Sequence, residues 1–78
     1  MNIYQLVRTC TTGSILDDFP IKTRNATHAK KIAREEFGPI NWDARQHKEG
    51  KVVWVEGWQH VEGFDCDVSI ERKEKSHG

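Results

Sequence analysis

The sequence predicts an α+β protein: a mainly antiparallel five-stranded sheet with one helix packed on one face, in the order ββαβββ. Three observations predict this fold. Residues 26–37 have helical periodicity, and most of the remaining segments alternate apolar and polar side chains or are rich in β-formers. Short turn signals join most of these segments, as in antiparallel hairpins. With 78 residues the chain is expected to form a single domain, residues 1–78, around one core.

Residues 26–37 predict the helix. Asn25 is a favourable N-cap residue, and Gly38 followed by Pro39 is the usual end of a helix. The apolar residues form one stripe, which we expect to face the sheet. The stripe consists of Ala26, Ala29, Ile32, Ala33 and Phe37.

The other segments predict five strands. Their ranges are 3–11, 15–24, 40–47, 51–60 and 64–71. Pro20 cannot donate a hydrogen bond to a ladder, so the second strand is expected at an edge of the sheet or to be irregular. The polar tail, 72–78, is expected to fray.

The strand predicted at 51–60 presents valines on one side and tryptophans on the other. Two arrangements remain open. In one, the helix covers Val53 and Val55, and Trp54 and Trp58 lie on an open face where Trp42 joins them. In the other, the tryptophans are core. An exposed tryptophan patch indicates a partner-binding surface, because large apolar patches and Trp hot spots mark interfaces.

Basic residues form a second candidate surface on the predicted helix. Lys30, Lys31 and Arg34 lie on its polar side, and Lys22 and Arg24 precede it. Such a cluster either remains solvated or contacts an acidic partner or a phosphate backbone.

The balanced charge and the lack of recognisable targeting segments limit the classes of function that fit this sequence. Twelve basic residues balance twelve acidic ones, whereas nucleic-acid-binding modules usually carry a basic excess. No apolar run is long enough to cross a membrane, and we find no signal peptide. We expect a cytoplasmic protein (in the host cytoplasm if it is phage-encoded) with its two cysteines reduced.

Catalytic and metal-binding motifs are not found in the sequence. The four histidines and two cysteines have no CxxC, HxxxH or HExxH spacing, and Cys66 alternates with apolar residues as a buried side chain would. There is no GxSxG and no phosphate-binding loop. We therefore expect no enzyme activity, no cofactor and no metal.

The helix segment resembles a helix of small phage and mobile-element proteins. The resemblance covers residues 25–38, and its closest stretch is Ala29-Lys30-Lys31-Ile32-Ala33. The element order is also similar to that of one group of anti-CRISPR inhibitors. The resemblance implies binding to the protein backbone of a type I RNA-guided surveillance complex, which blocks pairing of target DNA with the guide. It makes Lys30, Lys31 and Arg34 the nearest candidates for the contacts.

These observations together predict a small non-catalytic binding protein. The most concrete hypothesis is a phage-type inhibitor that blocks a host protein–nucleic-acid complex, with Trp42, Trp54 and Trp58 as anchors and the basic residues steering the approach. One alternative is a nucleic-acid-binding module that stacks bases on the exposed tryptophans. Another is a regulatory homodimer joined through the same face.

Overall fold

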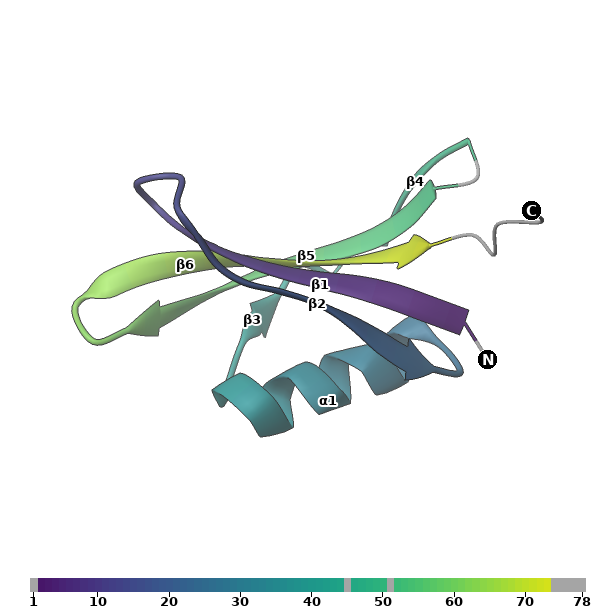
Figure 1. Ribbon diagram of the computed structural model, residues 1–78, viewed down its shortest axis with the longest axis horizontal. Coiled ribbons are helices and arrows are strands. Elements are labelled where there is room, and N and C mark those ends of the chain that lie inside the picture. Colours follow the sequence, from purple (N-terminus) through teal and green to yellow (C-terminus); the bar gives the residue numbers. More distant parts are fainter. Residues whose placement is uncertain (1, 45, 51, 74–78) are drawn as a thin grey trace.

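The computed structural model describes residues 2–44, 46–50 and 52–73. In these residues a curved sheet lies across one helix (Figure 1). The elements are β1 (Asn2–Cys10), β2 (Ile15–Thr23), α1 (Ala26–Phe37), β3 (Asn41–Trp42), β4 (His47–Glu49), β5 (Val52–Val61) and β6 (Phe64–Lys73).

Every strand pairing in the sheet is antiparallel. The order is β2-β1-β6-β5-β3, and β4 also pairs with β5. This confirms the predicted α+β class with a mainly antiparallel sheet and one helix. It also confirms that β2, which contains Pro20, is an edge strand.

The described residues form six strands where five were predicted, because the segment 40–47 divides into β3 and β4. Trp42 pairs with Gly57 and His47 pairs with Trp54. The chain therefore advances five residues from Trp42 to His47, while the opposing part of β5 advances only three. The stretch between these two pairings is two residues longer than the opposing stretch of β5, and we call this irregularity the bulge between β3 and β4. Arg45, and Lys51, the expected first residue of the next strand, lie outside the described residues.

Helix α1 begins and ends where the sequence predicts. The Asn25 side chain accepts a hydrogen bond from the His28 backbone N–H at 2.9 Å. Gly38 has φ +83°, and its N–H donates to the Arg34 carbonyl at 2.8 Å. In the described part of the chain, no helix is long and apolar enough to span a membrane.

The core lies between α1 and one face of the sheet. The small side chains of Ala29 and Ala33 are fully buried and let the helix lie close to the strands. Around them pack the buried sheet residues Tyr4, Leu6, Ile21, Val55, Val68 and Ile70. The predicted helix stripe therefore faces the sheet.

The last strand is longer than predicted. Arg72 pairs with Tyr4 and Lys73 with Ile3, so both residues belong to β6 rather than to a frayed tail. Residues 74–78, the rest of the predicted tail, lie outside the described residues.

Candidate functional site: the open face of the sheet

Because α1 covers one face of the sheet, alternate residues of β5 have opposite surroundings. Val53 and Val55 are buried on the helix side. Trp54 is half-buried and Trp58 is 51% exposed on the other side, which we call the open face. Of the two arrangements that the sequence leaves open, the structure has the one in which the helix covers the valines.

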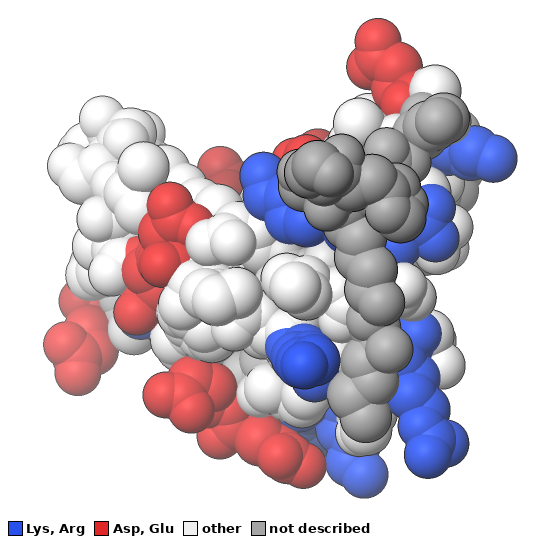
Figure 2. Space-filling model, turned by 45° about the vertical axis from the view of Figure 1, so that its right-hand side comes forward, with Lys and Arg blue, Asp and Glu red and all other residues white. Residues whose placement is uncertain are grey.

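The open face contains a hollow of about 600 Å³. The small side chains of Val7 and Ser69, which are register partners, contribute to its lining, so the middle of the sheet carries little bulk. Trp58 and Asp43 line it from the β3–β5 side. In Figure 2 the upper surface dips between the raised left and right ends of the molecule. The hollow can therefore accept a protruding group of a partner.

Each tryptophan of the open face stands opposite a carboxylate on β6. Trp58 pairs in register with Asp67, and Trp54 pairs with Glu71. Glu56 lies between the two tryptophans on the same side of β5. We call these five residues the tryptophan–carboxylate patch. Its aromatic rings and negative charges favour a ligand that is both apolar and positively charged.

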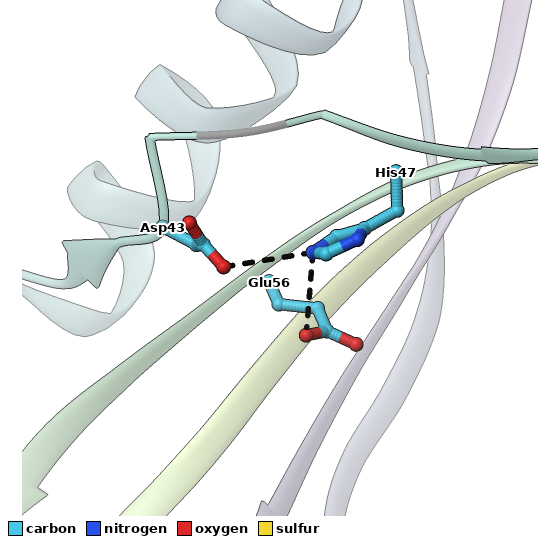
Figure 3. Close-up of side chains that lie close together, drawn as sticks. All are labelled: Asp43, His47 and Glu56. Carbon is cyan, nitrogen blue, oxygen red and sulfur yellow. Dashed lines mark ion pairs between the residues drawn. The ribbon is translucent and has the colours of Figure 1, made fainter.

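A second cluster, next to the patch, joins an imidazole to two carboxylates. His47 Nε2 lies 3.5 Å from Asp43 Oδ2 and 3.6 Å from Glu56 Oε2 (Figure 3). The His47 ring stacks on Trp54 with the ring centres 5.3 Å apart and the planes inclined by 17°. The Trp54 indole N–H donates to Glu56 Oε1 at 3.1 Å. These oxygen and nitrogen atoms could serve as ligands for a cation.

Trp42 differs from the expectation that it would join the other tryptophans. Its ring packs against the core on the helix side, with Lys30 Nζ 5.6 Å from the ring centre. The reason is its register partner, Gly57: a Cβ added there would lie 2.8 Å from Trp42 Cε3, so glycine makes room for the indole. Trp42 also contributes to the lining of the hollow.

The basic residues predicted on the helix are on the opposite side of the sheet from the patch. Lys30 is half-buried over Trp42, while Lys31 and Arg34 are exposed on α1. The six predicted contact residues therefore do not form one surface. Figure 2 shows that charge is also segregated, with basic side chains gathered toward the right of the view and most acidic ones to their left.

Sequence reasoning missed the Asp43–His47–Glu56 cluster. Asp43 and His47 are four residues apart, so an unbroken strand over 40–47 would place them on the same face but about 13 Å from each other, too far apart for both to reach Glu56. The bulge between β3 and β4 brings them together. The only signal in the sequence is that Glu56 falls on the same side of the predicted strand as Trp54 and Trp58.

No protein-family model matches this chain, and the search of curated proteins found no match either. The function must therefore be inferred from the geometry and charge of these surfaces.

Proposed function

We propose that this protein is a small, non-catalytic binding protein whose tryptophan–carboxylate patch occupies a basic surface of another protein. The observation that carries this proposal is the pairing of each open-face tryptophan with a carboxylate, Trp58 with Asp67 and Trp54 with Glu71. A lysine or arginine of the partner can lie over the indole and at the same time pair with the carboxylate.

Electrostatics favours a protein partner over a nucleic acid. A base-stacking platform interleaves its aromatic side chains with lysine and arginine, which neutralise phosphates. Here the neighbours of the tryptophans are Glu56, Asp67 and Glu71. These carboxylates repel a phosphate backbone and attract a cationic protein surface.

The most concrete target is a host RNA-guided complex, because the helix segment 29–33 and the element order resemble anti-CRISPR inhibitors. Such complexes hold nucleic acid in positively charged channels. A rigid face with Trp58 as an anchor and carboxylates around it fits a channel of this kind and would exclude DNA by occupying it. Lys31 and Arg34 then contact the partner only where it reaches the helix side.

A pull-down from bacterial lysate tests the proposal, using tagged wild type and two variants with and without nuclease. Trp58→Ala removes the proposed anchor. Ile15→Ala is the matched control, because Ile15 is an exposed apolar residue at the start of the edge strand β2 and does not line the hollow. We expect a stoichiometric protein complex that survives nuclease, is lost with Trp58→Ala and is kept with Ile15→Ala. The captured complex should also lose binding to its target DNA.

Two other results would contradict the proposal. Recovery of nucleic acid alone, together with quenching of Trp fluorescence by a single-stranded oligonucleotide, would indicate a stacking module. A particle of twice the 9.0 kDa chain mass by light scattering, reduced to one chain by Trp58→Ala, would indicate that the patch is a homodimer interface.

A further inference from the structure

Three side chains from separate segments converge beside the tryptophan–carboxylate patch. Asp43 follows β3, His47 begins β4 and Glu56 lies in the middle of β5. One ligand atom from each lies within 4.8 Å of the others. In Figure 3 the His47 ring points toward both carboxylates.

The separations suit a shared cation better than direct hydrogen bonds. His47 Nε2 lies 3.5 Å and 3.6 Å from the two carboxylate oxygens, beyond the usual N–H···O range of about 2.7–3.2 Å. Two ligands at about 2.0–2.1 Å from a tetrahedral Zn²⁺ lie about 3.4 Å apart. The three groups can therefore reach one ion with small side-chain adjustments.

The surroundings of His47 Nε2 favour a ligand at this atom. This atom is buried from solvent and has no hydrogen-bond partner among the described residues, although the other parts of the ring leave the side chain 29% exposed. Buried polar atoms are ordinarily satisfied, and a metal ion satisfies an imidazole nitrogen directly.

Trp54 positions two of the three groups. Its ring stacks on His47, and its indole N–H holds the Glu56 oxygen Oε1, which leaves Oε2 directed at the imidazole. Outer contacts of this kind fix the orientation of ligands at metal sites. The arrangement is therefore more organised than an exposed group of acids.

We propose that Asp43, His47 and Glu56 bind a divalent transition-metal ion of the Zn²⁺ class. One imidazole and two carboxylates suit Zn²⁺, whereas Mg²⁺ and Ca²⁺ prefer all-oxygen sites with more ligands. The fourth position is available to water or to a partner side chain. A bound ion ties β3 and β4 to β5 and neutralises negative charge beside the patch. This proposal does not depend on the proposed function.

Isothermal calorimetry of ZnCl₂ added to the full chain tests the site. We expect one ion per chain, and His47→Gln should weaken binding at least tenfold because it removes the nitrogen ligand. His60→Gln is the matched control and should bind zinc like the wild type. His60 lies on β5 and its Nδ1 is 2.9 Å from Asp65 Oδ1, but its side chain is 62% exposed.

Glu56→Gln is a second variant in case His47→Gln does not fold, which circular dichroism would show. It keeps the side-chain shape and an oxygen for the Trp54 N–H, so the fold should persist while zinc affinity falls at least tenfold. Zinc binding that does not saturate below millimolar concentrations overturns the proposal. Equal affinity of the folded ligand variants and wild type also overturns it, as does a loss with His60→Gln that matches theirs.

Discussion

The two faces of the sheet are built from alternate residues of the same strands, but they differ in composition and in packing. On the helix side, Leu6, Val55 and Ile70 are at most 2% exposed and meet the alanines of α1. On the open face, Val7 and Ser69 line a hollow that carboxylates and tryptophans surround. The comparison teaches that one face supplies the stability of the fold and leaves the other free to carry charge and aromatic surface. Substitutions on the two faces should therefore separate stability from binding.

The largest expected loss of stability comes from a substitution on the helix side of the sheet. Leu6→Ala removes a fully buried side chain from the centre of the core, and we expect it to lower the free energy of unfolding by about 2–5 kcal/mol. Urea denaturation followed by far-UV circular dichroism measures this. An effect below about 1 kcal/mol would show that the helix does not hold the core as described.

The same substitution made on both faces sharpens the comparison. Gln59 is buried; its Oε1 accepts from Arg8 Nη1 at 3.0 Å, and its Nε2 donates to the Phe37 and Pro39 carbonyls at 3.1 Å and 3.3 Å. Gln59→Leu leaves these groups without partners and should cost about 1–3 kcal/mol.

Gln5→Leu is the counterpart on the open face, where the Gln5 amide donates to the Asp18 carboxylate at an exposed position. We expect a loss within about 0.5 kcal/mol, because water can replace the lost bond. Equal losses for the two variants in urea denaturation would contradict the distinction between the faces.

Local patterns in the sequence predicted the helix and the two opposite rows of side chains on β5. Asn25 and Gly38 bound α1 because capping acts within a few residues of the chain. The period-2 alternation of β5 separates Val55 from Trp54 and Trp58, and one helix can cover one face. What alternation leaves open is which of the two rows the helix covers.

The candidate site depended on pairings that no local pattern contains. The bulge between β3 and β4 arises from the way Trp42 and His47 pair with β5, and it alone brings Asp43 and His47 to Glu56. Trp42 was misplaced because a continued alternation ignored the space that Gly57 leaves on the helix side. Such features follow from contacts between distant residues.

Truncating the open-face anchor is expected to cost less stability than Leu6→Ala and to affect binding instead. Trp58→Ala removes a ring that is half exposed, so we expect a loss of about 1 kcal/mol in unfolding free energy. Affinity for the partner should fall by about 2 kcal/mol or more if Trp58 is an anchor. Thermal melts and binding titrations of the same preparations measure both. A strong fall in melting temperature with unchanged affinity would show that Trp58 supports the fold instead.

The last comparison uses the reactivity of the two cysteines and involves no substitution. One thiol lies at the border of the core and the other in its interior. Cys10 and Cys66 are register partners on β1 and β6, but Cys66 is fully buried and Cys10 is half-buried. A hydrogen bond with the Thr12 hydroxyl, 2.7 Å from Sγ, lowers the pKa of Cys10, whereas burial raises the pKa of Cys66.

A lower pKa means more thiolate at a given pH below it, and the thiolate is the form that reacts. Iodoacetamide at a pH of about 7 to 8 should therefore modify Cys10 first, and Cys66 should react only after denaturant is added. Raising the pH in this range should speed the reaction of Cys10 until its thiolate form predominates, at a lower pH than for an ordinary thiol. Peptide mapping by mass spectrometry distinguishes the two sites. Equal labelling of both thiols in the native protein would mean that the core opens at the β1–β6 pairing, and that the helix-covered face is less closed there than the burial of Cys66 requires.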